Sequence, residues 1–491
     1  ALTLEFPEGV PVWNPEGTEW LMGSFPVVVE NEVNAGEYGF LKEQWLEKKN
    51  PGLMTFGIRL YLRKRFIFAF HPDDTSYILL QNLSNYRKGF EYAVLAPMTG
   101  SRSVLTIADE AAHKIIRKNI NPAFRPLALQ SIAEQVSNRH IRKAFADLTT
   151  DARKGLVLQP VLRNFMLGLV SEAAFKTNDP DIGHQFEKLQ STLFTNVLAA
   201  VPYGTLIPTE ANRVTRAASG KLRAHARRMI LEARAQLAEF AKQGKTPPPA
   251  ATLLDVLVRP PEDGGHGFRD DEEIIDQCCT FLFAGHETTS ASLEWFAYAL
   301  ATHPDEEKAL FEEAESVVSL QAVPTLDTVL HHMPLLNRFM REVWRVWPAA
   351  PSVVRTAVDD DVLPGSGQVV PAGLAVVVST FYAQRLPLIW GDDADEFRPA
   401  RWDEPHSAIV ARAEKLVASG GRSLFLEQQK ACKLQQPPWN RPNEPLADRI
   451  PRTAWMPFLV GHRSCIGQNF AQHAVLLSAA VMLRRYKWRM S

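Results

Sequence analysis

The residue with the clearest chemical potential in this sequence is a cysteine near the C-terminus, Cys465, in the stretch MPFLVGHRSCIGQNF. Gly461 precedes it and Gly467 follows it closely. The next apolar residues recur at the spacing of one helical face: Ile466, Phe470, Ala474, Leu477 and Val481. Cys465 is therefore expected at or just before a helix N-terminus, where unpaired N–H groups and the positive end of the helix dipole favour a thiolate.

A thiolate in this setting could ligate a metal ion. The two glycines permit tight turns and close approach of the backbone, and His462 and Arg463 add positive charge. Haem iron is one metal that accepts a cysteine thiolate, and a loop with little bulk leaves room for a flat ligand. The alternative is the commoner role of a lone cysteine, a small buried hydrophobe. The rest of the sequence has to decide between the two.

A second unusual stretch, FLFAGHETTSAS at 281–292, lies inside a predicted long helix. It contains Gly285, which costs about 1 kcal/mol relative to alanine in a helix interior, together with threonines that are poor helix formers. The Thr288 hydroxyl can donate to the carbonyl of Ala284 one turn back. That would open a groove beside Gly285 in which a small ligand or water could lie. The alternative is close packing of two helices through small residues.

The pattern Phe458-x-x-Gly461-x-Arg463-x-Cys465-x-Gly467 resembles the haem-binding loop of the cytochrome P450 family. Several fixed positions within ten residues make a chance match improbable. The resemblance implies that Cys465 is the ligand of the haem iron. It also implies that the other residues of the pattern contact or shape the site of the cofactor, which is haem b.

The stretch FAGHETT resembles the oxygen-activation motif of the same family, Ala/Gly-Gly-x-Asp/Glu-Thr. The resemblance places Ala284 and Gly285 against the haem. It implies that Thr288 forms hydrogen bonds to dioxygen and a water, and that Glu287 relays protons from solvent as a general acid.

Other charged residues occur in the family's order. His113 and Arg117, in HKIIR, resemble the Trp/His-x-x-x-Arg motif, whose side chains share one helix face and can donate to a haem propionate. Arg355 stands where relatives carry another propionate-binding arginine, and Arg463 is a third candidate. Taken singly, each of these would more often be a solvated surface charge.

A further set of charges is expected to be structural. Glu342 and Arg345, in EVWR, are one helical turn apart and can pair. Arg401, in FRPARW, is similar to the family's arginine that joins this pair. The resemblance implies that the three residues hold the core beneath the haem.

The elements that position these residues are mostly helices. The spacing of apolar residues predicts helical structure over 107–242, and Asp270 with Glu273 resembles a capping box at the start of a long helix over 270–302. Further helices are predicted at 306–318 and 326–347, a hairpin at 54–70, and strands at 352–358 and 374–379. The sequence predicts one mainly α domain over 1–491 with a small β part, of the P450 type. The haem would lie between the long central helix and the helix after Cys465. The segment 403–452 is a longer-than-usual insertion with a helix-like part, SAIVARAEKLVA, and a Pro-rich part.

Composition excludes several classes of protein. The chain has 491 residues, a net charge of −1 and no long basic run, which argues against a nucleic-acid partner. It has only four cysteines, which does not fit a secreted disulfide scaffold and favours a reducing, cytosol-facing compartment. It also lacks the run of about 18 apolar residues that a membrane span needs, and its first residues are not a signal peptide. Either the protein is cytoplasmic, or an anchor upstream of residue 1 holds it at a membrane.

We therefore expect a haem-thiolate monooxygenase that inserts one atom of O2 into a lipophilic substrate. The resemblance is to eukaryotic microsomal-type members more than to bacterial ones. It implies electrons from NADPH through a separate NADPH–cytochrome P450 reductase, cytochrome b5 as a second candidate partner, and docking on the cytosolic face of the endoplasmic reticulum membrane.

Three alternatives stay open. An O2-independent haem-thiolate isomerase or peroxygenase would often lack the pair formed by Glu287 and Thr288. A non-catalytic haem protein that senses or carries gas would not need a proton relay. A haem-free helical scaffold would lack visible absorbance. Substrate contacts are expected from the largely apolar segments 90–104 and 192–208 and from the segment after Arg355. The stretch LLQNLSNYRKG resembles fatty-acid hydroxylases of the family.

Overall fold

The chain divides into two units in the computed structural model, which describes residues 12–13, 55–59, 65–124, 140–141, 157–193, 206–259, 267–318, 324–431 and 450–489. The first unit comprises Ala1–Gly89 and Arg341–Cys465 and holds the strands. The second comprises Phe90–Met340 and Ile466–Ser491 and is helical in its described residues.

The main sheet of the first unit has the strand order β1-β2-β3-β8-β5-β4. Its strands are β1 (Val12–Trp13), β2 (Thr55–Arg59), β3 (Arg65–Ala69), β4 (Tyr86–Arg87), β5 (Ser352–Ala357) and β8 (Ala375–Ser379). A second, two-stranded sheet pairs β6 (Asp361–Val362) with β7 (Val369–Val370). The antiparallel pairing of β2 with β3 confirms the predicted hairpin, and the antiparallel pairing of β5 with β8 confirms the two predicted strands.

Both faces of the central strands β3 and β8 are buried because their side chains alternate between two apolar clusters. Phe66 and Phe68 of β3 join one cluster with Val377, whereas Ile67 joins the other with Val376. β3 and β8 are parallel neighbours, so side chains of the two strands share each face. A central strand that is covered on both faces has a continuous apolar sequence, as AVVVS in β8 shows.

The predicted insertion contributes helices to the first unit. Its helix-like part forms α16 (His406–Ala418), as expected, and a second helix, α17 (Leu424–Ala431), was not predicted. Two hydrogen bonds fix α17 to the preceding segment of the chain. The Phe425 N–H in its first turn donates to Asp392 at 2.9 Å, and its buried Gln428 accepts from the Leu388 N–H at 2.8 Å. The Pro-rich part lies mostly outside the described residues. Short helices α2 (Pro72–Ser76), η3 (Tyr77–Gln81), α14 (Thr380–Ala383), α15 (Pro387–Trp390) and η9 (Pro399–Asp403) accompany them.

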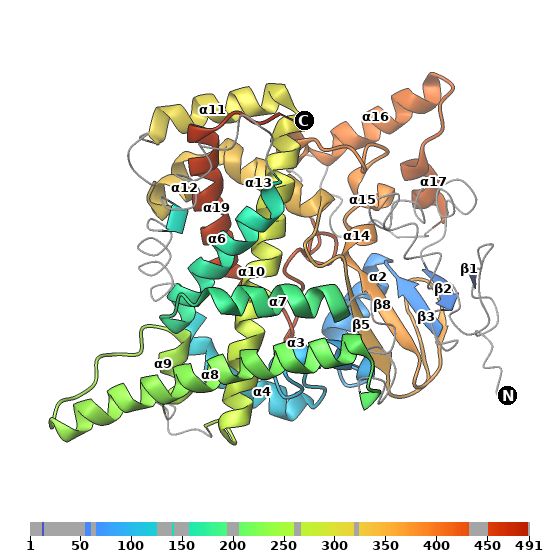
Figure 1. The fold of residues 1–491 in the computed structure, drawn as a ribbon. Helices are drawn as coiled ribbons and strands as arrows, with labels where there is room; N and C mark the ends of the chain where they lie inside the picture. Colours follow the sequence, from blue (N-terminus) through green and yellow to red (C-terminus); the bar gives the residue numbers. More distant parts are fainter. Residues whose placement is uncertain are drawn as a thin grey trace. The chain divides into compact units, whose positions relative to one another are not determined.

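The second unit is built around α10 (Asp271–Thr302), which packs against α6, α8, α3 and α19, while α7 lies along α8 (Figure 1). The helices of this unit include α3 (Ala96–Thr99), α4 (Glu110–Ile120), α6 (Leu158–Phe175), α7 (Pro180–Leu193), α8 (Glu210–Lys242), α9 (Leu253–Val258), α11 (Pro304–Val317), α12 (Leu326–His332) and α19 (Gln468–Arg485). No helix in the described part of the chain is long and apolar enough to cross a membrane.

The long helix begins and ends where the sequence predicts. Asp270 is its N-cap and accepts a hydrogen bond from the Glu273 N–H at 2.9 Å. The Glu273 carboxylate in turn accepts from the Arg269 N–H at 2.8 Å, one residue before the usual partner in a capping box. The result is a rigid element of 32 residues that carries the FAGHETT stretch in its middle.

The predicted single helix over 326–347 is wrong. The structure has two helices there, α12 and α13 (Pro334–Val346), separated at Met333. Pro334 lacks an N–H, and its ring disfavours helical backbone at the preceding residue, so the first helix ends before it.

Candidate functional site

The cysteine loop of the first unit closes on itself through backbone hydrogen bonds. The Cys465 N–H donates to the Phe458 carbonyl at 2.8 Å, and the Ser464 N–H donates to the Gly461 carbonyl at 3.0 Å. Gly461 has φ +79°, and a Cβ atom there would lie 2.4 Å from the Leu79 carbonyl oxygen. Only glycine can therefore occupy this position, both for its backbone conformation and for its approach to η3.

Cys465 differs from the other cysteines that the structure describes. Cys278 and Cys279 are buried in α10, and burial raises the pKa of both thiols, that of Cys279 to about 12. They are the inert apolar cysteines of this chain. Cys465 is exposed, two residues before Gly467, which caps α19. An exposed sulfur in a constrained, glycine-bounded loop suits a metal ligand, so the donor chemistry fits haem iron.

The arginines predicted to bind propionates are not solvated surface charges in the first unit. Arg463 lies in the cysteine loop and is 8% exposed, and Arg355 on β5 is 4% exposed. One Arg355 N–H donates to the Val354 carbonyl at 2.8 Å. Guanidinium groups are rarely buried without a reason, and a planar donor fork suits a carboxylate ligand. In the second unit, His113 is buried and Arg117 is half-buried on α4, at the i, i+4 spacing expected.

The oxygen-activation stretch brings four predicted residues into one turn of α10. The Thr288 hydroxyl donates to the Ala284 carbonyl at 2.9 Å, as the sequence predicts. Thr288 is exposed, whereas Thr289 and Ser290 beside it are buried. Its side chain is therefore presented on an uncovered strip of a core helix.

Gly285 has a packing role in the structure. A Cβ atom at this position would lie 3.0 Å from Cγ1 of Val170 on α6. That distance is tighter than ordinary van der Waals contact, so the absent side chain lets α6 approach α10. The alternative of close helix packing therefore describes this residue, and its predicted contact with a cofactor stays a prediction.

Glu287 is held by two residues that sequence reasoning did not find. Its Oε1 accepts from Arg163 of α6 at 2.6 Å, and its Oε2 accepts from Gln190 of α7 at 2.8 Å. His286 Nε2 lies 3.7 Å from the same carboxylate, too far for a hydrogen bond. Burial lowers the pKa of His286, and the ring hydrogen-bonds the Leu282 carbonyl at 2.6 Å through Nδ1, so this histidine is neutral. No local sequence signal points to contacts across 124 and 97 residues.

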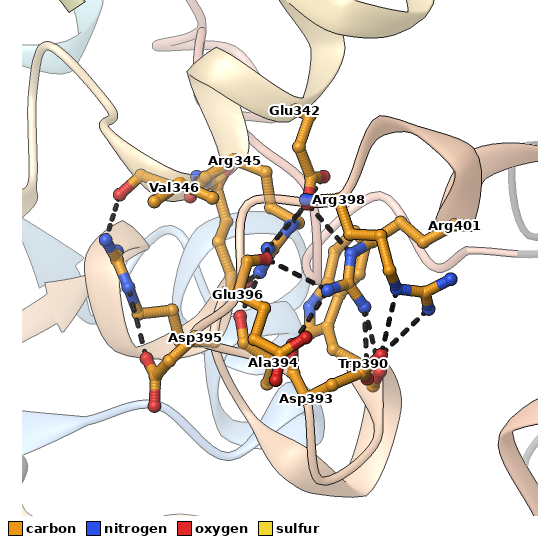
Figure 2. Close-up of polar contacts among 12 residues, drawn as sticks. Glu342, Arg345, Val346, Trp390, Asp393, Ala394, Asp395, Glu396, Arg398 and Arg401 are labelled. Atoms are coloured by element: carbon orange, nitrogen blue, oxygen red, sulfur yellow. Dashed lines mark hydrogen bonds and ion pairs between the residues drawn. The ribbon is translucent and has the colours of Figure 1, made fainter. Parts of the chain in front are cut away.

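The predicted structural trio forms a buried cluster in the first unit (Figure 2). Glu342 accepts from Arg345 at 2.8 Å twice and from Arg401 at 2.8 Å. It also accepts from the Arg398 N–H at 2.9 Å and from Trp402 Nε1 at 3.0 Å. Burial alone would raise the pKa of Glu342, but the charges of Arg345 and Arg401 outweigh it and hold the pKa below its usual value.

The predicted site residues therefore fall into two sets. The first unit holds Phe458, Gly461, Arg463 and Cys465 on one loop, with Arg355 on β5. The second unit holds the remaining candidates: Ala284, Gly285, Glu287 and Thr288 on α10, His113 and Arg117 on α4, and Gly467 at the cap of α19.

Comparisons with known proteins show the family and the fold. The cytochrome P450 family model matches residues 54–491. Cytochrome P450 monooxygenase sphH of Aspergillus fumigatus is 28% identical over 508 aligned residues, covering 95% of this chain and 81% of its own length. Cytochrome P450 3A29 of Sus scrofa is 24% identical, over 80% of this chain and 71% of its own. The solved structure of retinoic acid bound cyanobacterial CYP120A1 has a TM-score of 0.70 at 20% identity, covering 94% of this chain and 90% of that one, which supports the fold. The chain belongs to the cytochrome P450 family, as a haem-dependent P450 monooxygenase.

Proposed function

We propose that the chain binds haem b through Cys465 and inserts one atom of O2 into a lipophilic substrate. The observation that carries the proposal is the exposed Cys465 in its closed loop, while the other described cysteines are buried. When bound, the haem supplies oxygen activation, and a thiolate ligand favours cleavage of the O–O bond. The protein supplies binding, orientation and protons.

The buried basic residues would hold the cofactor's carboxylates. Arg355 and Arg463 would do so from the first unit, and His113 with Arg117 from the second. Each offers N–H donors, and charge-assisted hydrogen bonds to a carboxylate are the stronger kind.

Thr288 and Glu287 would manage protons. The Thr288 hydroxyl hydrogen is engaged with the Ala284 carbonyl, so its oxygen can accept a hydrogen bond from a water on the exposed side of α10. The Glu287 side chain is 27% exposed and can exchange protons with solvent. A proton taken up by this carboxylate can pass to the water held by Thr288, which is general-acid catalysis.

We further propose that electrons come from NADPH through a separate NADPH–cytochrome P450 reductase, with cytochrome b5 as a second donor. The protein would work at the cytosolic face of the endoplasmic reticulum membrane. Support comes from the resemblance to microsomal-type members and from the match to the Sus scrofa P450. The segment 90–104 carries the apolar side chains Val94 and Leu95, which are only partly buried, and this supports a lipophilic substrate.

The test is absorbance of the purified, haem-loaded protein. Reduced protein with carbon monoxide should show the red-shifted Soret band of thiolate ligation, and Cys465→Ser should lose it while Cys278→Ser keeps it. A panel of dodecanoic acid, a sterol and a retinoid should then reveal substrate class by spectral shifts. Turnover of an organic hydroperoxide without NADPH would favour an isomerase or peroxygenase instead, and NADPH-independent gas binding without product would favour a carrier.

A further inference from the structure

A short segment of the second unit is attached to the central helix by side chains that the proposed proton delivery does not use. The segment is 99–106, which contains the end of α3 and the turn after it, and its partners lie on α10. The Thr280 hydroxyl donates to the Thr99 carbonyl at 2.9 Å. Arg102 donates through both terminal nitrogens to the Asp270 carboxylate, at 2.8 and 3.0 Å. At 1.5 Å per residue, these contacts attach the segment along about 15 Å of the helix axis.

Gln277 binds this segment as a neighbouring β-strand would. Its Oε1 accepts from the Val104 N–H at 2.9 Å, and its Nε2 donates to the Arg102 carbonyl at 3.1 Å. Gln277 is 0% exposed, so water has no access to its amide group. A substitution that removes the amide would leave the buried Val104 N–H without its acceptor, which is costly.

Asp276 joins the same segment to α8. Its Oδ2 accepts from the Arg102 N–H at 2.9 Å, and its Oδ1 accepts from Arg223 of α8 at 2.7 Å. This close approach depends on Gly100, which has φ +76° and whose Cβ atom would lie 2.0 Å from Cγ of Asp276. A side chain at position 100 would therefore displace the segment from the helix.

The attached segment lies on the face of α10 that also carries Thr288. Gln277, Ala284 and Thr288 are spaced by seven and four residues, so they lie within about 40° of one another around the helix axis. Gln277 and Thr280 are buried, Ala284 is partly exposed and Thr288 is exposed. The cover of this face therefore ends between Thr280 and Ala284. Thr280 precedes Thr288 by about 12 Å along the axis.

We propose that Gln277 and Asp276 determine specificity, because they fix the segment 99–106 as a rigid wall that limits the length of a ligand beside Thr288. The inference rests on the proposed function, in which a lipophilic substrate is oxidised next to Thr288. A chain that extends from Thr288 toward the start of α10 meets this wall within about 12 Å. Both residues are buried beneath the segment, so they are positioning residues that act through it.

The first experiment tests the attachment and needs neither ligand nor turnover. Hydrogen exchange of the Val104 amide is measured in the haem-loaded protein by mass spectrometry at residue resolution. Gln277→Leu should speed this exchange by about 2–10-fold, the factor that one net hydrogen bond supplies. Gln277→Glu keeps an acceptor for the Val104 N–H and should leave the amide protected. Unchanged exchange in Gln277→Leu would overturn the attachment.

The second experiment measures the position of the wall with a series of 1-alkylimidazoles, from methyl to dodecyl, whose ring nitrogen binds haem iron and shifts its spectrum. In wild type, each added methylene group should raise the affinity by up to about fourfold until the chain meets the wall. Beyond that length the affinity should level off or fall. Gln277→Leu should move this limit to longer chains while 1-methylimidazole binds as in wild type.

Matched variants separate the wall from a general loss of stability. Asp276→Ala should move the limit as Gln277→Leu does, whereas Asp276→Asn, which keeps an acceptor for the Arg102 N–H, should restore it. Gln185→Leu removes another buried glutamine, on α7, whose amide donates to Asp181 at 2.8 Å. This control should lower the denaturation midpoint without moving the limit.

Failure of the inference and failure of the proposed function give different results. If wild type and Gln277→Leu have the same limit, or if wild-type affinity climbs without limit to the dodecyl chain, the segment is no wall and the inference is overturned. A wild-type protein whose spectrum no alkylimidazole shifts has no accessible haem iron, which refutes the proposed function and the wall together. The exchange of the Val104 amide still decides the attachment in that case.

Discussion

Replacing Glu342 with alanine should cause the largest loss of stability of any single charge removal in the first unit. Glu342 is fully buried and accepts five hydrogen bonds, three of them from Arg345 and Arg401. These arginines are 0% and 1% exposed, so water cannot replace the carboxylate. The substitution therefore leaves two cations buried beside each other without their shared anion.

The size of the effect follows from what remains bonded. Arg345 keeps hydrogen bonds to the Gln384, Ala394 and Glu396 carbonyls. Arg401 keeps hydrogen bonds to the Trp390, Asp393 and Glu396 carbonyls and a longer ion pair with the Asp393 carboxylate at 3.3 Å. The substitution therefore mainly removes the negative charge that compensates the two arginines. Removing one partner of a buried ion pair costs about 3–5 kcal/mol of unfolding free energy. A domain has about 5–15 kcal/mol in total, so the variant would lose a large fraction of its stability. Glu342→Gln should do little better, because its amide group would face donors from Arg345 or Trp402.

The assay is chemical denaturation together with haem content per protein. Glu342→Ala should give haem-poor, aggregation-prone protein with a strongly lowered denaturation midpoint. The control is Glu427→Ala, which removes an exposed bidentate pair with Arg422 at 2.8 Å and should leave the denaturation midpoint almost unchanged, because water and salt screen an exposed pair. A Glu342→Ala protein that is fully loaded with haem and unfolds at the wild-type midpoint would refute the reasoning.

Four further outcomes are expected. Cys465→Ser should lose the red-shifted Soret band of the reduced protein with carbon monoxide. A variant that keeps this band would refute the assignment of Cys465 as the iron ligand. Thr288→Ala should keep haem content and substrate binding but shift product toward hydrogen peroxide at constant NADPH consumption, since positioned proton transfer is worth about 10²–10⁴-fold; an unchanged ratio of product to NADPH would leave Thr288 a packing residue. Gly461→Ala should impair folding, because the positive φ alone costs roughly 1–2 kcal/mol and the new methyl group meets a carbonyl oxygen; a wild-type denaturation midpoint would contradict it. Finally, the pKa of Glu342 is lowered on folding, so its contribution is fully present above its ordinary value of 4.5 and is lost as pH falls below that. The denaturation midpoint of wild type should therefore fall more steeply in acid than that of Glu342→Ala, and parallel pH profiles would argue against this.

Local patterns were sufficient for most of the described fold. The continuous apolar runs of β3 and β8 and the cap at Asp270 lie within the elements that they specify or next to them, so each is readable in the sequence. The two wrong predictions have different causes, one local and one long-range. Pro334 lies inside an otherwise continuous apolar helical pattern, and that pattern alone predicts one helix where the structure has two. α17 is short and depends on hydrogen bonds with Asp392 and Leu388, which precede it by more than thirty residues, so no local pattern predicts it.

The site residues show the same difference between local contacts and contacts that are distant in sequence. The cysteine loop and the Thr288 back-bond are made by residues within ten positions of each other, so type and spacing specified them. The partners of Glu287 come from two other helices, and helix propensity or apolar period carries no information about a polar contact across a tertiary interface. Arg163 even resembles a solvated charge in sequence. Its importance follows from a contact that only the structure supplies, the ion pair with Glu287 at 2.6 Å. A motif can thus name the acid of a proton relay, whereas the restraint on that acid is a property of helix packing and has to be read from coordinates.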